Sequence, residues 1–169
     1  MASRRDFFRT LLKPAAVLPE KEEGAPLRVR PPYVVDASLF QSRCVECESK
    51  ACATACEESI IVIAAEGDPV INFAKGGCTF CDACADACEA GVLDKERGPE
   101  RIAARFTIDV KSCVAHHGTI CFACKEPCLD NAILFNGLFN PVIDMDRCTA
   151  CGFCLDRCPT RAIRYEATV

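Results

Sequence analysis

Sixteen of the 169 residues are cysteines, and they fall into four groups of four. We call these groups quartets and number them along the chain: Cys44, Cys47, Cys52 and Cys56; Cys78, Cys81, Cys84 and Cys88; Cys113, Cys121, Cys124 and Cys128; Cys148, Cys151, Cys154 and Cys158. The second and fourth quartets have the spacing C-x2-C-x2-C-x3-C. A tight loop with this spacing offers thiolates to three corners of a 4Fe–4S core, and its fourth cysteine typically binds the other cluster of a pair. The pattern predicts four 4Fe–4S clusters held by all sixteen cysteines.

Two other uses of cysteine fit the spacing less well. A disulfide framework is typical of small secreted chains and joins distant loops, whereas these cysteines stand two residues apart several times in succession. Zinc sites take two ligands from each of two separated C-x2-C pairs, and the quartets do not have that layout. Both alternatives therefore explain the pattern worse than iron–sulfur binding.

No other reactive site is visible in the sequence. The c-type haem motif C-x-x-C-H, a glycine-rich phosphate loop and a nucleophile beside a base are all missing, so we expect an electron-transfer or accessory protein and not an enzyme. The formal net charge of −4 without a basic cluster argues against nucleic acid as a partner. The longest apolar run, Ile60–Ala65, is far shorter than the roughly 20 residues of a transmembrane helix.

The segments around the quartets repeat. Five residues before each first cysteine stands an apolar residue: Leu39, Phe73, Ile108 and Ile143. Four and five residues after each last cysteine stand two more: Ile60 and Ile61, Val92 and Leu93, Ala132 and Ile133, Ala162 and Ile163. This repeat predicts four units, each with a leading strand, a cysteine loop, a short helical turn and a trailing strand.

The segments between the quartets differ and sort the units into pairs. Residues 59–73 and 132–145 each contain two apolar runs around a turn with Gly, Asn, Asp or Pro, which predicts two hairpins. Residues 94–101 are charged and broken by Gly98-Pro99, which indicates a surface linker. We therefore expect an α+β fold of two tandem bacterial-ferredoxin-like (βαββαβ-type) 4Fe–4S dicluster modules, residues 34–93 and 105–169, with linker 94–104.

Two ligand arrangements are open within each module. The fourth cysteine lies at the far end of a helical turn, away from its own loop, which favours exchange of fourth cysteines between paired quartets. The exchanged sets are Cys44, Cys47, Cys52 with Cys88; Cys78, Cys81, Cys84 with Cys56; Cys113, Cys121, Cys124 with Cys158; and Cys148, Cys151, Cys154 with Cys128. The alternative is that each quartet binds one cluster by itself.

The first and third quartets depart from the regular spacing. The gaps C-x4-C in the first and C-x7-C in the third are either harmless loop insertions or features that tune a labile cluster. His116 and His117 lie in the longer gap, as solvated residues or as replacement ligands. The third quartet is the least certain site, and three clusters are expected if it is vacant.

Residues 1–33 form an N-terminal basic amphipathic segment followed by a Pro-rich linker. Ser3-Arg4-Arg5 resembles a twin-arginine export motif, but charged residues and prolines interrupt the apolar stretch that export requires. The phenylalanines and leucines within residues 7–12 fall on one helical face. This face either docks on a partner, covers the edge of the first module or is frayed.

The order of these features resembles the NapF family, ferredoxin-type accessory proteins of periplasmic nitrate reductase. The resemblance rests on the early Ser-Arg-Arg, on Arg30-Pro31-Pro32 and above all on the long gap between Cys113 and Cys121. The gap between Cys47 and Cys52 departs from the family pattern. The resemblance implies a cytoplasmic protein that acts on the precursor of the nitrate reductase catalytic subunit before its export and helps its iron–sulfur maturation.

Three functions agree with these features. The first is an assembly factor for that subunit, and it predicts a specific complex and a labile cluster. The second is a polyferredoxin electron carrier with a redox partner protein, and it predicts reversible cycling without a unique client. The third is an electron-transfer subunit of another oxidoreductase. Deleting residues 1–13 should weaken client binding in the first case and leave redox behaviour intact in the second.

Overall fold

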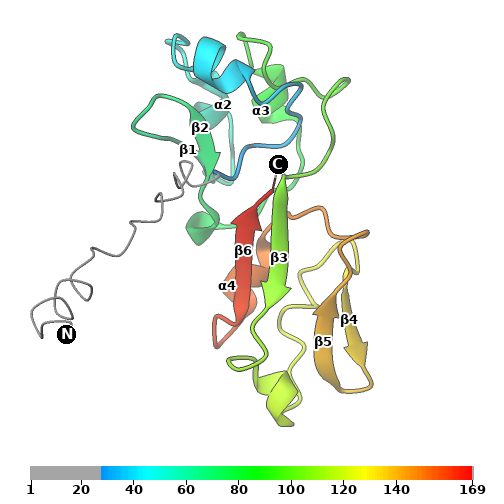
Figure 1. Ribbon diagram of the computed structural model, residues 1–169. Coiled ribbons are helices and arrows are strands. Elements are labelled where there is room, and N and C mark those ends of the chain that lie inside the picture. Colours follow the sequence, from blue (N-terminus) through cyan, green and yellow to red (C-terminus); the bar gives the residue numbers. More distant parts are fainter. Residues whose placement is uncertain (1–27, 169) are drawn as a thin grey trace, which may run out of the picture.

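The computed structural model describes residues 28–168, which form a small α+β fold with short helices and three two-stranded antiparallel sheets (Figure 1). The N-terminal half contains one of these sheets, formed within residues 61–71, and the C-terminal half contains the other two, formed within residues 104–167. The predicted amphipathic segment and the early Arg-Arg pair lie outside the described residues.

The N-terminal half is built around one hairpin. Strands β1 (Ile61–Ile63) and β2 (Pro69–Ile71) pair in antiparallel register, which confirms the first predicted hairpin. Helices α2 (Ala51–Thr54) and α3 (Ala83–Asp86) are single turns that pack against each other. The outer strands expected here are reduced to one antiparallel bridge between Val34 and Leu93.

The C-terminal half has longer strands. Strand β3 (Ala104–Ile108) pairs with β6 (Ile163–Ala167), and β4 (Ile133–Asn136) pairs with β5 (Phe139–Ile143) around a bulge, which confirms the second predicted hairpin. Helix α4 (Phe153–Arg157) precedes β6. A 3-10 helix, η3 (Val114–His117), lies in the long gap of the third quartet.

Two of the four leading strands were predicted wrongly. Leu39 directly precedes a π-helix, η1 (Phe40–Cys44), because the Asp36 carboxylate accepts hydrogen bonds from the backbone N–H and hydroxyl of Ser38 and starts a turn. Phe73 opens a 3-10 helix, η2 (Phe73–Lys75), whose first turn is capped by the side chain of Asn72. Ile108 and Ile143 end strands, as expected.

A left-handed turn repeats after every quartet. The third residue after the last cysteine has a positive φ in all four units: Ser59 at 53°, Gly91 at 61°, Asn131 at 50° and Arg161 at 51°. In each case its N–H donates to the carbonyl of that cysteine, at 2.9 to 3.2 Å. This turn ends the helical stretch and redirects the chain, so the apolar residues that follow become buried. The repeat expected from the sequence therefore extends to the backbone.

The two halves share one hydrophobic core. Phe73 from the N-terminal half meets Phe106 on β3 edge to face, with ring centroids 5.5 Å apart, and Tyr165 on β6 at 5.0 Å. In Figure 1 the segment after β2 accordingly lies beside β6. Residues 94–104 join the halves, and within them Ile102 is fully buried and donates from its N–H to the carbonyl of Thr149. The halves are thus packed against each other.

The described part of the chain has no helix with the length and apolar character needed to cross a membrane.

Candidate metal-cluster sites

Four small cavities each bring four cysteines together. We number them by the quartet that supplies three of the four. The first cavity has Cys44, Cys47, Cys52 and Cys88; the second Cys78, Cys81, Cys84 and Cys56; the third Cys113, Cys121, Cys124 and Cys158; the fourth Cys148, Cys151, Cys154 and Cys128. Every one of these cavities takes its last cysteine from the paired quartet, which is the exchanged arrangement.

The short helices explain this exchange. Helix α3 carries Cys84, which lines the second cavity, and Cys88 follows the helix end and lines the first. Helix α4 does the same with Cys154 and Cys158 for the fourth and third cavities. A helix rises about 1.5 Å per residue, so cysteines four positions apart lie about 6 Å apart along its axis. One helical turn therefore presents one thiol to each of two neighbouring cavities.

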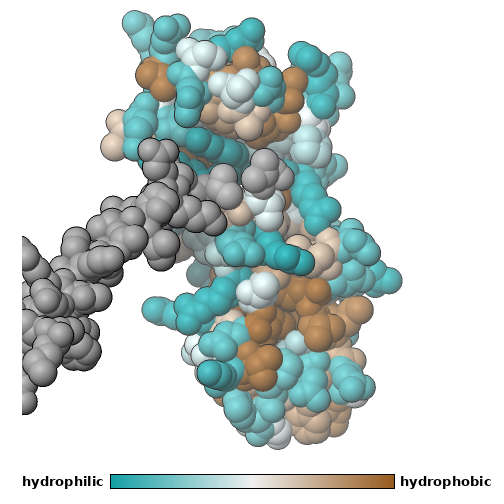
Figure 2. Space-filling model, in the orientation of Figure 1, coloured by the Kyte–Doolittle hydropathy of each residue, from teal (hydrophilic) through white to brown (hydrophobic). Residues whose placement is uncertain are grey.

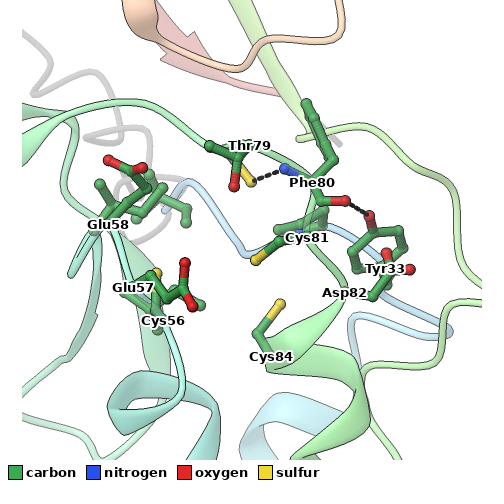
Figure 3. Close-up of a pocket in the computed structure, with 14 residues that line it drawn as sticks. Tyr33, Cys56, Glu57, Glu58, Thr79, Phe80, Cys81, Asp82 and Cys84 are labelled. Atoms are coloured by element: carbon green, nitrogen blue, oxygen red, sulfur yellow. Dashed lines mark hydrogen bonds between the residues drawn. The ribbon is translucent and has the colours of Figure 1, made fainter.

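Figure 3 shows the second cavity, where Cys81 and Cys84 project into the space that Cys56 borders from another segment. The N–H of Phe80 donates to the sulfur of Cys78 at 3.4 Å, and the hydroxyl of buried Tyr33 donates to the carbonyl of Phe80 at 3.1 Å. Tyr33 thus supports the backbone of the cysteine loop at Phe80, the residue whose N–H contacts Cys78. Nothing in the local sequence pattern relates Tyr33 to the second quartet, so this role was not predicted.

Backbone donors point at the sulfur of the last cysteine in three quartets. The N–H of Leu93 donates to Cys88, that of Ala132 to Cys128 and that of Ala162 to Cys158, at distances of 3.4, 3.3 and 3.2 Å. The left-handed turn before each donor places it there. Hydrogen bonds to a thiolate stabilise its charge, so these donors suit sulfur atoms that bind a metal.

Burial disfavours free thiolates in these cavities. Together with the charges of neighbouring cysteines, burial raises the pKa of Cys84 to about 12 and that of Cys44 to about 11. Burial also raises the pKa of Cys124 to about 11 and is the main cause of the raised pKa of Cys154. Four thiolates can share such a space only when a cationic core compensates their charge, which is the chemistry of a cluster site.

The first cavity contains a lysine that the regular quartets lack. The two extra residues between Cys47 and Cys52 make room for Lys50, whose ammonium donates to the carbonyls of Cys44 and Gly67. The pKa of Cys47 is lowered, first by a hydrogen bond from Ser49 and also by the backbone N–H and the charge of Lys50. At Cys44 the charge of Lys50 only partly opposes the rise in pKa that burial causes. The irregular spacing was recognised in the sequence, but the role of Lys50 was missed; a cation between two cysteines of one loop is the signal that could have indicated it.

The two histidines of the third quartet lie outside the lining of the third cavity. Nε2 of His116 is 3.2 Å from the carbonyl of Pro141, and Nε2 of His117 is 3.1 Å from the carbonyl of Lys111. Helix η3 takes up most of the long gap, and its Val114 and Ala115 line the cavity beside Cys113. The geometry supports four cysteines at this site and not a histidine.

All sixteen cysteines are free, and within residues 28–168 no three His, Cys, Asp or Glu side chains are close enough to hold one metal ion. A mononuclear zinc site requires all its sulfurs at about 2.3 Å from one point. No group of cysteines within residues 28–168 meets this condition, whereas each of the four cavities is lined by four cysteines.

Comparison with known proteins agrees with this chemistry. Residues 141–164, which contain the fourth quartet, match the 4Fe-4S binding domain family. The chain is 35% identical to the ferredoxin-type protein NapF of Escherichia coli, over 82% of this chain and 84% of that protein. It is 33% identical to NapF of Haemophilus influenzae, over 95% and 91%, and 29% identical to the ferredoxin-type protein NapG of that organism, over 80% and 56%. The predicted family is confirmed, and the chain belongs to the NapF family of ferredoxin-type proteins.

Proposed function

We propose that this ferredoxin-type protein binds four 4Fe–4S clusters, one in each cavity, through the exchanged cysteine sets. The observation that carries the proposal is that four separate cavities each contain four cysteines, three from one quartet and one from its partner. The modules would then be residues 34–93 and 105–169. The clusters would supply one-electron chemistry. The protein would bind them through thiolates, stabilise sulfur charge through backbone N–H groups and limit the access of water by partial burial of the cysteines.

We further propose that the protein is a cytoplasmic accessory factor for the nitrate reductase catalytic subunit before export, helping its iron–sulfur maturation. Membership of the NapF family supports this role, and a reducing compartment suits sixteen free thiols. The surface offers a place for a protein partner. Leu134 and Val142 face each other across β4 and β5 and are 39% and 55% exposed. Figure 2 shows hydrophobic residues gathered on the lower half of the molecule.

Iron and acid-labile sulfide per chain, measured on anaerobically purified protein, test the cluster assignment. We expect about sixteen irons and coupled signals in the EPR spectrum of the reduced protein. About twelve irons would indicate that the third cavity is vacant or labile. Zinc without sulfide would refute the proposal.

A polyferredoxin electron carrier, or an electron-transfer subunit of another oxidoreductase, is the alternative, because an exposed Cys81 and half-buried cysteines leave the cavities accessible to redox partners. A pull-down with the immature catalytic subunit separates the two roles. The accessory role requires a specific complex that weakens when residues 1–13 are deleted, while the clusters keep their redox behaviour. The carrier role requires reversible cycling with a redox partner and no such complex.

A further inference from the structure

The contact between the two halves of the molecule joins two particular cavities. The N–H of Cys78, in the second cavity, donates to the carbonyl of Cys151, in the fourth, at 2.7 Å. Both residues are members of cavity walls, so a single hydrogen bond separates the two backbones that carry them. Within each half the link runs along the chain itself: α3 joins the first and second cavities, and α4 joins the third and fourth.

Two glycines allow this close approach. A Cβ atom added to Gly77 would lie 2.6 Å from the ring of Phe153, and one added to Gly152 would lie 2.3 Å from the ring of Phe73. Real Cβ atoms do not approach so closely, so any side chain at either position must push the two halves apart or displace a ring. Gly77 directly precedes Cys78 of the second cavity. Gly152 directly precedes helix α4, which carries Cys154 of the fourth cavity.

We propose that this junction is the electron-transfer contact between the halves, that the order of transfer is first, second, fourth, third cavity, and that Gly77 and Gly152 are its positioning residues. The inference rests on the proposed clusters. The contact carries one electron at a time, oxidising the centre on one side by one electron and reducing the centre on the other by one, with no bond made or broken. Figure 1 shows α2 at one end of the molecule and the yellow-green segment that contains η3 at the other. Helix α2 carries Cys52 of the first cavity, and η3 carries Val114 and Ala115, which line the third.

Two ligand variants of the full chain test this order. An inner-pair variant, Cys44→Ser, Cys88→Ser, Cys113→Ser and Cys158→Ser, keeps the second and fourth cavities. An outer-pair variant, Cys56→Ser, Cys84→Ser, Cys128→Ser and Cys154→Ser, keeps the first and third. Each should bind about eight irons. We expect magnetic splitting in the EPR spectrum of the reduced inner-pair variant and its loss in the outer-pair variant. Two independent signals from a loaded inner-pair variant would overturn the proposal.

Glycine variants of the otherwise unmodified chain test the positioning residues and also decide the matter if the inner-pair variant fails to load. Gly77→Ala and Gly152→Ala should reduce the part of the splitting that arises between the second and fourth cavities. Gly118→Ala is the control, since Gly118 has φ +81°, close to the +92° of Gly152, but no atom within 4 Å of an added Cβ. Unchanged spectra in both junction variants at full iron content would overturn the proposal. Fewer than about sixteen irons in the unmodified protein would count against the proposed clusters instead.

Discussion

At the scale of single residues, Lys50 distinguishes the first cavity from the other three. Its ammonium is held by two carbonyls, one of them from Cys44, so the charge lies next to the thiolates of that site. A positive charge beside a cluster stabilises the added electron and raises the reduction potential. The first cavity would therefore hold the electron more strongly than it would without this lysine.

The change Lys50→Met tests this effect. Removing one partly exposed charge is worth on the order of 1 kcal/mol, which for a one-electron couple is a few tens of millivolts. We expect one of the four clusters to shift to a lower potential by this amount in a redox titration followed by EPR. Lys75→Met is the control, because Lys75 is exposed and its ammonium has no hydrogen bond or ion pair among the described residues. Equal effects of the two variants would contradict the role of Lys50.

The sequence was sufficient to group the sixteen cysteines into quartets but not to identify the residues that support them. Cysteine spacing is a local property, and the quartets are visible without any fold. Tyr33 supports Phe80 across 47 positions of chain, and the Cys78–Cys151 contact joins different halves. Such contacts depend on how the elements pack, so no local sequence pattern predicts them.

At the scale of elements, the exchange of fourth cysteines is testable by counting irons in paired variants. With exchanged sets, Cys44→Ser with Cys88→Ser removes ligands from one cluster only, and about twelve irons should remain. Cys44→Ser with Cys56→Ser removes a ligand from each of two clusters, and about eight should remain. If each quartet bound its own cluster, the two results would be interchanged. Each double variant is thus the matched control of the other.

The left-handed turn after each quartet makes a second prediction for an element. Arg161 has a φ of 51° and an exposed side chain, so its substitution changes the backbone preference without affecting the core. A β-branched residue tolerates this conformation poorly, and we expect Arg161→Val to cost about 1–2 kcal/mol of stability. Arg161→Gly should cost nothing or stabilise slightly. The guanidinium concentration that abolishes the cluster absorbance measures both, and equal losses would show that the side chain and not the turn matters.

The hairpins were predictable and the outer strands of the N-terminal half were not. The turn residues between two apolar runs determine β1–β2 and β4–β5 locally. The segment before the first quartet has a similar apolar residue, Leu39, but the turn that Asp36 and Ser38 form directs the chain into a helical stretch. Hydrophobic position alone did not distinguish a strand from a helical turn over so few residues.

At the scale of the whole molecule, cluster binding changes the charge. The chain has a formal net charge of −4, sixteen thiolates add sixteen negative charges, and four oxidised cores of +2 each return eight. The loaded protein should therefore carry a net charge of about −12, and the electrostatic potential at its surface should be negative. Acidic side chains add to this effect beside the first cavity, where Glu46, Glu48 and Glu89 border an open groove next to Cys47.

This charge predicts that electron transfer to a basic partner is sensitive to salt. With a small basic redox protein as the probe, the second-order rate should fall at least about tenfold between low salt and about 0.5 M salt. The pair Glu46→Gln and Glu48→Gln should lower the rate at low salt more than Glu96→Gln and Glu100→Gln, which remove the same charge from the exposed segment between the halves. Stopped-flow kinetics at several ionic strengths measure both effects. Only the first pair borders the groove beside Cys47. Equal effects would therefore mean that the total charge attracts the partner and that this groove does not guide it.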